Sequence, residues 1–215
     1  MMDLEDIDFK YQNLKITLAN QVYQPAEDTF QLLESIEIEK NDRILEIGTG
    51  TGIIALKCAT KKTNIIATDI NPKAIKIAKK NYKQNKENLK GKIEFIKTNL
   101  FKDIDKEKKF DKIIFNPPYV SIKNEKIRIK EKWLNQATDG GPDGLKTLKK
   151  FIKKLPLYLK KPDGKAFFIT SSSSNLTKVK KYINCSHLKS KILSEKKHES
   201  ETLYVYQINH IKKIK

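Results

Sequence analysis

Short apolar runs that indicate β-strands alternate along most of the chain with longer segments whose apolar residues recur at helical spacing. Strands are expected at residues 43–47, 63–68, 92–96, 112–115 and 165–170, and helices at 27–36, 52–60, 72–84, 144–159 and 175–182. Parallel strands need a crossover connection of a dozen or more residues, which a helix usually supplies. The alternation therefore predicts a doubly wound α/β fold with ligands at the C-terminal strand ends.

The end of the chain departs from this alternation. The last two expected strands, at 189–194 and 202–208, are separated only by residues 195–201, which fit a hairpin connection and leave no room for a helix. A hairpin reverses the chain direction, so one of these strands must run antiparallel to the others. We therefore expect a mostly parallel seven-stranded sheet with one antiparallel C-terminal strand.

No internal repeat or linker divides the chain, and 215 residues suit one medium α/β domain. We expect a single domain over residues 1–215. Within it, residues 1–40 would contribute an N-terminal extended segment, at 15–23, and a helix that pack on the ligand site. Residues 41–215 would form the α/β core.

The charge is strongly positive, with 44 basic and 26 acidic residues and a net charge of +18. Only Arg43 and Arg128 are arginines, and all other basic residues are lysine. Proteins that read nucleic acids usually use arginine, because its planar fork matches guanine edges and phosphates. The charge therefore leaves two interpretations open, a solvated basic surface and a patch for an anionic partner.

Several protein classes are excluded by composition. No apolar run reaches the ~18–20 residues that span a bilayer, and the acidic start differs from a secretory signal. The only cysteines, Cys58 and Cys185, cannot form a disulfide framework or a four-ligand zinc site. His187, His198 and His210 lack metal-binding spacing and are expected at the surface. We expect a cytoplasmic protein without a bound metal.

A glycine-rich turn follows the first core strand. Gly48, Gly50 and Gly52 have the spacing G-x-G-x-G, which differs from the G-x-G-x-x-G of dinucleotide sites. Glycines at such a turn let a ligand approach the backbone. Asp69 ends the next strand, 21 residues after Gly48, where a carboxylate can accept hydrogen bonds from both ribose hydroxyls.

Glu46 narrows the class of ligand. A carboxylate beside the glycine turn would repel a pyrophosphate but suits an ammonium or sulfonium group. S-adenosylmethionine carries both cationic groups and no phosphate, so it is the expected cofactor. The alternative is a glycine-rich turn beside a surface acid, without a ligand.

A second motif, Asn116-Pro117-Pro118-Tyr119, ends the strand at 112–115. The Asn116 side-chain oxygen and the Pro117 carbonyl could each accept one N–H of a planar NH₂ group. Two successive prolines would stiffen the backbone that directs this carbonyl, and Tyr119 could stack on the planar group. The motif predicts methyl transfer to an amide or adenine nitrogen, although a simple Pro-Pro turn is an alternative.

These residues resemble the class I S-adenosylmethionine-dependent methyltransferases that carry an Asn-Pro-Pro-Tyr signature. Residues 22–30, Val-Tyr-Gln-Pro-Ala-Glu-Asp-Thr-Phe, resemble the N-terminal signature of HemK-related protein methyltransferases of archaeal and eukaryotic type. The resemblance implies a Rossmann-like fold and N5-methylation of the glutamine in the Gly-Gly-Gln motif of a class I peptide chain release factor. It also implies a small zinc-binding activator protein as a heterodimer partner.

The resemblance assigns site residues by position. The implied cofactor-binding residues are Thr29, Glu46, Gly48, Gly50, Gly52, Asp69, Ile70, Asn99, Leu100 and Asn116. The implied substrate-binding residues are Asn116, Pro117, Pro118, Tyr119 and Val120, of which Asn116, Pro117 and Tyr119 would be catalytic. Asn99 departs from the family, which commonly has Asp there. Its side-chain oxygen could still accept a hydrogen bond from the adenine amino group.

Two other functions stay open. A DNA or RNA adenine-N6 methyltransferase could use the same four residues, and the positive charge fits it. The chain, however, leaves little room for a separate recognition domain. A non-catalytic binding module on the same fold is a third possibility, which intact Asn116 and Asp69 argue against.

The connection from residue 119 to 142 is long and polar, which is typical of lids and binding loops. We expect it to become ordered when substrate binds, with slower amide hydrogen exchange. Residues 139–144, Asp-Gly-Gly-Pro-Asp-Gly, fit a turn and helix cap or the edge of a substrate channel.

Overall fold

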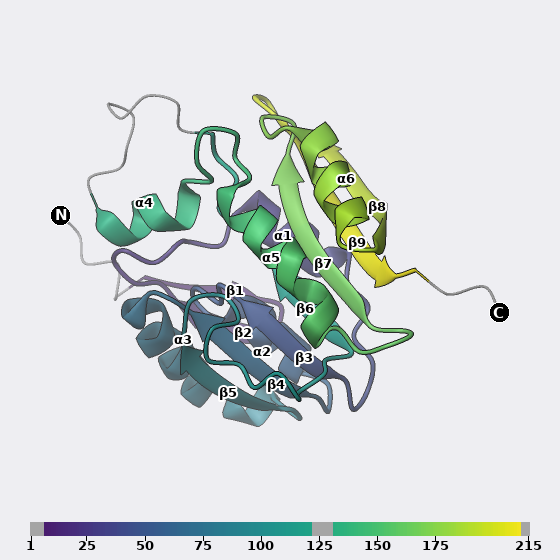
Figure 1. Cartoon of the computed structure of the whole chain (residues 1–215). Coiled ribbons are helices and arrows are strands. Elements are labelled where there is room, and N and C mark those ends of the chain that lie inside the picture. The colour runs from purple at the N-terminus through teal and green to yellow at the C-terminus, as the bar shows by residue number, and fades with distance from the viewer. Residues whose placement is uncertain (1–6, 122–130, 212–215) are drawn as a thin grey trace.

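The computed structural model describes residues 7–121 and 131–211. Its centre is a seven-stranded sheet with the strand order β5-β4-β3-β6-β7-β9-β8 (Figure 1). The strands of this sheet are β3 (Arg43–Ile47), β4 (Asn64–Asp69), β5 (Lys92–Lys97), β6 (Lys112–Phe115), β7 (Lys165–Ser171), β8 (Leu188–Lys197) and β9 (Thr202–His210). The helices are α1 (Glu27–Glu34), α2 (Ile53–Ala59), α3 (Pro72–Gln84), a 3-10 turn (Lys86–Asn88), α4 (Lys132–Thr138), α5 (Lys146–Tyr158) and α6 (Leu176–Cys185).

The strand directions confirm the predicted sheet. β5, β4, β3, β6 and β7 pair in parallel, whereas β9 is antiparallel to both of its neighbours, β7 and β8. The antiparallel strand is therefore inserted inside the sheet, and β8 forms the edge. This follows from the hairpin, because β9 turns back from β8 and fills the space beside β7.

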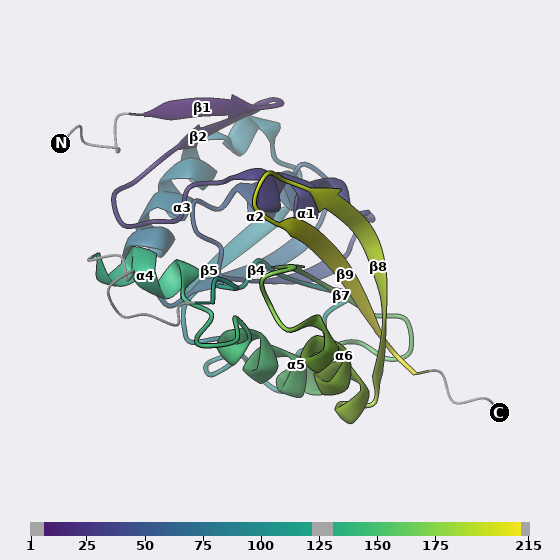
Figure 2. The same cartoon turned by 90° about the horizontal axis from the view of Figure 1, so that it is seen from above.

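Helices cover both faces of the sheet (Figure 2). Helices α5 and α6 lie on one face, and α1, α2 and α3 lie on the other. Side chains of β3 alternate between the two cores, with Leu45 and Ile47 on the α5 side and Ile44 on the α2 side. This alternation explains why the central strands are nearly continuous apolar runs, since both of their faces are buried.

The N-terminal segment differs from the single extended run expected at 15–23. β1 (Asp8–Tyr11) and β2 (Leu14–Thr17) form a separate antiparallel hairpin. Two asparagines hold it in place, Asn81 of α3 and Asn85, the residue that caps the C-terminal end of α3. The Asn81 and Asn85 side chains each bond to the backbone N–H and C=O of β2, at Thr17 and Lys15 respectively. These side chains take the place of a neighbouring strand, because they form the hydrogen bonds that the backbone N–H and C=O groups of β2 need.

Other local expectations have mixed outcomes. The start of α3 is confirmed, because Asn71 caps the helix by accepting a 2.9 Å hydrogen bond from the Lys73 N–H, and Pro72 is its first residue. The surface position expected for His210 is wrong. Its side chain is buried, with Nε2 3.0 Å from the Leu159 carbonyl oxygen.

The connection 119–142 contains a helix that the sequence pattern did not predict, α4. Residues 122–130 of the expected lid lie outside the described residues, so its ordering on substrate binding stays a prediction. In the described ranges, no helix is long and apolar enough to cross a bilayer.

Candidate active site

A cavity of about 560 Å³ opens at the C-terminal ends of β3, β4, β5 and β6, a size that suits a small-molecule ligand. The N-terminal segment, α4 and α5 form its other walls. Twelve predicted site residues line this cavity, namely Thr29, Gly48, Gly50, Asp69, Ile70, Asn99, Leu100, Asn116, Pro117, Pro118, Tyr119 and Val120. The structure therefore gathers residues from five separate chain segments at the strand ends, as the doubly wound fold predicts.

The three glycines of the turn have different roles. Gly48 (φ +71°) and Gly50 (φ +56°) line the cavity, and a Cβ on Gly48 would lie only 3.3 Å from the Phe115 ring. Gly52 (φ +86°) does not line it. A Cβ there would lie 3.0 Å from the Ala78 Cβ atom, so Gly52 allows α2 to pack closely against α3.

Asp69 holds the glycine turn in place. Its Oδ2 accepts a 2.9 Å hydrogen bond from the Gly50 N–H, and its Oδ1 accepts a 2.8 Å bond from the Asn71 N–H. Burial raises the pKa of this carboxyl group, and the backbone hydrogen bonds oppose that shift. Each carboxylate oxygen has a further lone pair, so both oxygens can also accept from ligand hydroxyls.

The loop that follows β5 has a strained backbone where it borders the cavity. Leu100 adopts φ +53°, in the left-handed region that a branched side chain rarely occupies, and it lines the cavity beside the exposed Asn99. Strained residues of this kind cluster at ligand sites.

Glu46 lies beneath the glycine turn and is 1% exposed. It does not line the cavity itself. Its Oε2 accepts a 2.6 Å hydrogen bond from the Thr49 hydroxyl, and Thr49 does line the cavity. Its Oε1 is buried without a partner among the described residues. Burial raises the pKa of Glu46 to about 8, although the Thr49 hydrogen bond acts in the opposite direction.

The raised pKa of Glu46 predicts a pH-dependent stability. The folded chain binds this proton more tightly than the unfolded chain does, so unfolding releases the proton between pH 4.5 and about 8. The free energy of unfolding should therefore fall as pH rises through this interval, relative to Glu46→Gln, by up to roughly 5 kcal/mol. Urea denaturation of both ligand-free proteins measures this difference. Parallel pH curves for the two proteins would contradict it.

Asp28 organises the opposite wall of the cavity. Its side chain is 3% exposed on α1. Oδ2 accepts hydrogen bonds from the Tyr23 hydroxyl (2.9 Å), Asn116 Nδ2 (3.0 Å) and the Tyr119 hydroxyl (3.1 Å). Oδ1 accepts from the Thr29 N–H at 2.6 Å and the Thr29 hydroxyl at 3.1 Å. Burial and the neighbouring Asp28 carboxylate raise the pKa values of Tyr23 and Tyr119.

Asp28 is the main site residue that the sequence analysis missed. It belongs to the 22–30 segment that carried the family resemblance, but no role was assigned to it. The available signal was an acid three residues after Pro25, on the expected helix at 27–36; its burial, which the structure shows, requires partners for the carboxylate. One partner, Tyr23, is near Asp28 in sequence, but Asn116 and Tyr119 lie 88 and 91 residues away. The sequence around Asp28 therefore did not show that its partners meet at the site.

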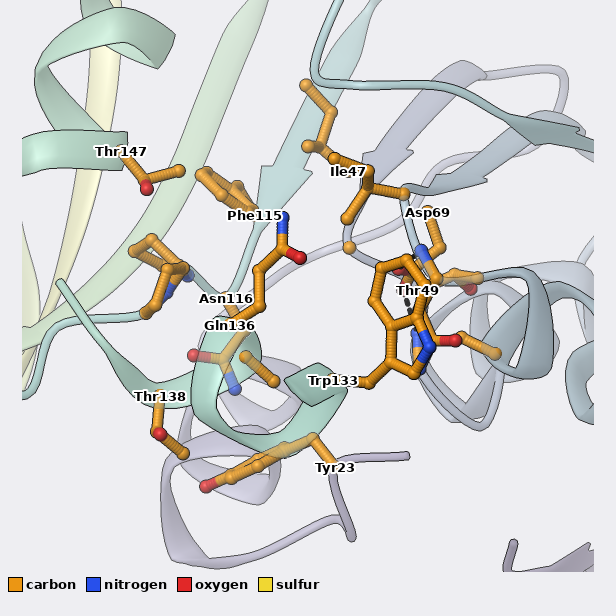
Figure 3. Close-up of a pocket in the computed structure, with 18 of the residues that line it drawn as sticks. Tyr23, Ile47, Thr49, Asp69, Phe115, Asn116, Trp133, Gln136, Thr138 and Thr147 are labelled. Atoms are coloured by element: carbon orange, nitrogen blue, oxygen red, sulfur yellow. Dashed lines mark hydrogen bonds between the residues drawn. The ribbon is translucent and has the colours of Figure 1, made fainter. Parts of the chain in front are cut away.

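Helix α4 contributes cavity residues that were also unexpected. Figure 3 shows Trp133 and Gln136 projecting from α4 toward the strand ends that carry Asp69 and Asn116. Lys132 of α4 and two lysines of α5 line the mouth. The helix was missed because it has only seven residues, none of them buried, and it lies in a polar connection.

The Asp-Gly-Gly-Pro-Asp-Gly segment supports the Asn-Pro-Pro-Tyr loop. Asp139 accepts a hydrogen bond from the Gly141 N–H, and Asp143 accepts one from the Leu145 N–H before α5 begins. A Cβ on Gly144 would lie 2.4 Å from the Tyr119 carbonyl oxygen. The segment thus forms turns and a helix start, as one interpretation expected, and Asp139 also lines the cavity.

Residues 26–146 match the family model described as the methyltransferase small domain. The chain belongs to this family. The matched range contains all of the predicted site residues.

Relatives with named activities are also similar to this chain. The methyltransferase is 45% identical over 152 residues to a protein N5-glutamine methyltransferase of Methanocaldococcus jannaschii, covering 70% of this chain and 73% of that protein. It is 36% identical over 174 residues to a release factor glutamine methyltransferase of Fusobacterium nucleatum. That alignment covers 75% of this chain but only 48% of the longer relative.

Solved structures support the fold of this methyltransferase over nearly its whole length. One match is the E. cuniculi Mtq2–Trm112 complex, described as responsible for methylation of the eRF1 translation termination factor. It has a TM-score of 0.67 at 20% identity and covers 89% of this chain and 99% of that chain. The likeness extends beyond the range of the family model, which matches residues 26–146.

Proposed function

We propose that this methyltransferase transfers a methyl group from S-adenosylmethionine to the side-chain nitrogen of the glutamine in the Gly-Gly-Gln motif of a class I peptide chain release factor. The observation that carries the proposal is the position of Asn116. Its carboxamide lies on the wall of a cavity that also contains the glycine turn and Asp69. The relatives named as glutamine methyltransferases support the same substrate.

The residues present fit the cofactor. Two carboxyl groups, the buried Glu46 and the half-buried Asp69, lie at the glycine turn, an arrangement that favours a cationic ligand over a phosphate. Asp69 would hold the ribose hydroxyls, and Asn99 the adenine amino group. When bound, S-adenosylmethionine supplies a sulfonium-linked methyl group that a nitrogen lone pair can attack.

The Asn-Pro-Pro-Tyr residues orient the acceptor nitrogen. A carboxamide nitrogen is a poor nucleophile because its lone pair is conjugated with the carbonyl group. The Asn116 side-chain oxygen and the Pro117 carbonyl accept its two N–H groups, which directs the nitrogen and stabilises positive charge as it develops. The proton leaves after transfer, so no general base is needed first.

Methyl transfer to the release factor tests this proposal. The full chain is incubated with methyl-labelled S-adenosylmethionine and an archaeal-type release factor, or with the same factor carrying Gln→Ala in its Gly-Gly-Gln motif. Label should enter the first factor and not the second, and mass spectrometry should place one methyl group on that glutamine. Equal labelling of both factors would contradict the proposal. Salt-sensitive labelling of an adenine oligonucleotide would favour the nucleic-acid alternative.

We further propose that a small zinc-binding activator protein binds the edge strand β5. Among the residues that the structure describes, β5 pairs only with β4 and ends the sheet order, so in this part of the chain one side of its backbone has no strand partner. A solved neighbour is itself a two-protein complex. A substrate from the translation apparatus would place the enzyme in the cytoplasm.

Hydrogen exchange checks the partner proposal. Adding an archaeal-type activator should slow amide exchange at residues 92–97 of β5. The opposite sheet edge, β8 at 188–197, serves as an internal control and should be unchanged. Protection at β8 alone, or no co-elution of the two proteins, would contradict the proposal.

A further inference from the structure

The carboxylate of Asp28 accepts hydrogen bonds from residues that line the cavity. Three donors, on Tyr23, Asn116 and Tyr119, converge on its Oδ2 atom at 2.9–3.1 Å. The other oxygen is bound by the Thr29 N–H and hydroxyl. The carboxylate is therefore held on both oxygens in one orientation, and burial shields it from water.

This arrangement determines which end of the Asn116 carboxamide points toward Asp28. An asparagine side chain has an NH₂ end and an oxygen end of nearly equal shape, and shape alone does not select which end meets a ligand. A carboxylate that accepts hydrogen bonds selects the NH₂ end. Nδ2 of Asn116 bonds to Asp28 and lies 3.4 Å from the Thr29 hydroxyl. The flipped amide would place two oxygens at hydrogen-bond distance, which is repulsive.

We propose that Asp28 is a positioning residue that holds the Asn116 amide with its oxygen toward the acceptor nitrogen. The inference rests on the proposed function, in which this oxygen accepts an N–H of the substrate carboxamide. Asp28 does not touch the reacting atoms and acts through Asn116. Tyr23 and Tyr119 bond to the same oxygen and keep the carboxylate from rotating.

The positioning role also gives a rule for substrates. With its oxygen facing the cavity, Asn116 can accept a hydrogen bond but cannot donate one at that side. The site therefore selects substrates that present N–H groups to Asn116, such as a primary carboxamide. It disfavours carboxylates, which can only accept hydrogen bonds. A release factor with Gln→Glu in its Gly-Gly-Gln motif should therefore bind poorly, because Asn116 offers no donor.

The test compares Asp28→Asn with the wild-type chain. An amide at position 28 can pair with either orientation of the Asn116 amide. The preference for one orientation is therefore lost, while the shape of the side chain at position 28 is kept. We expect kcat for release-factor methylation to fall about 10- to 100-fold. The dissociation constant of S-adenosylhomocysteine should stay within about twofold and the melting temperature within a few degrees, because the packing is retained.

A double-mutant cycle separates positioning from a general structural effect. In an Asn116→Ala background, Asp28→Asn should cost less than about twofold, because there is no amide left to orient. Tyr23→Phe removes one donor to Oδ2 and serves as a second variant if Asp28→Asn is unstable. Its kcat should fall about 2- to 5-fold, and this loss should also vanish in the Asn116→Ala background.

The outcomes are distinguishable. Equal losses from Asp28→Asn, or from Tyr23→Phe, in the wild-type and Asn116→Ala backgrounds would overturn the positioning role while leaving the proposed function in place. A kcat of Asp28→Asn within twofold of wild type would do the same. Absence of methylation by the wild-type chain would overturn the proposed function, and the role of Asp28 with it.

Discussion

Asn116→Ala is expected to lower kcat for glutamine methylation by about 10²- to 10³-fold and to change S-adenosylmethionine affinity by less than about threefold. The Asn116 oxygen bonds the acceptor most strongly when positive charge builds on the nitrogen, so its loss raises the barrier more than it weakens binding. Steady-state rates at saturating cofactor and release factor measure kcat, and isothermal titration calorimetry measures affinity.

The control for Asn116 is an asparagine far from the cavity. The side chain of Asn88, in the 3-10 turn, bonds to Asn13 at the surface, so Asn88→Ala should leave both constants unchanged. Equal losses of kcat and affinity in Asn116→Ala would show that Asn116 mainly binds the cofactor. The assignment of Asn116 to the acceptor nitrogen would then be wrong.

Asp69→Ala is expected to raise the dissociation constant of S-adenosylmethionine by at least about 100-fold, with a much smaller change in kcat at saturation. Two hydrogen bonds from ribose hydroxyls to a carboxylate would be lost, each worth about 1.5–3 kcal/mol. The variant also frees the Gly50 N–H that Asp69 now holds, so the turn loses part of its preorganisation.

Binding to the Asp69 variant can be followed by fluorescence. Trp133 is the single tryptophan of the chain and lines the cavity, so its emission should report cofactor binding. Asp69→Asn keeps one acceptor oxygen and should show an intermediate loss. Asp111, at the opposite end of the sheet beside Arg43, provides a matched control whose replacement by alanine should leave affinity unchanged. Wild-type affinity in Asp69→Ala would remove Asp69 from the site.

The sheet could be predicted because its signals are local. β3 and β6 have the expected bounds, and α3 begins at Pro72 after its Asn71 cap, since apolar periodicity and capping act within a few residues. The β1–β2 hairpin and α4 were not predicted. These elements have four to seven residues each, and short elements depend on contacts from elsewhere, such as those of Asn81 and Asn85.

The glycine turn, Asp69 and the Asn-Pro-Pro-Tyr loop were identified from sequence because each motif is contiguous and stands at a strand end. Their assembly around one cavity also followed, since parallel strands direct their C-terminal ends to one edge. The hydrogen-bond partners of Asp28 depended on tertiary structure. Asp28 lies about 90 residues from Asn116 and Tyr119. Only the packing of α1 against the sheet brings the side chains of these two residues within 3.1 Å of the Asp28 Oδ2 atom, which Tyr23 also contacts. Hydrogen bonds form over a few tenths of an ångström, a precision that sequence periodicity does not carry.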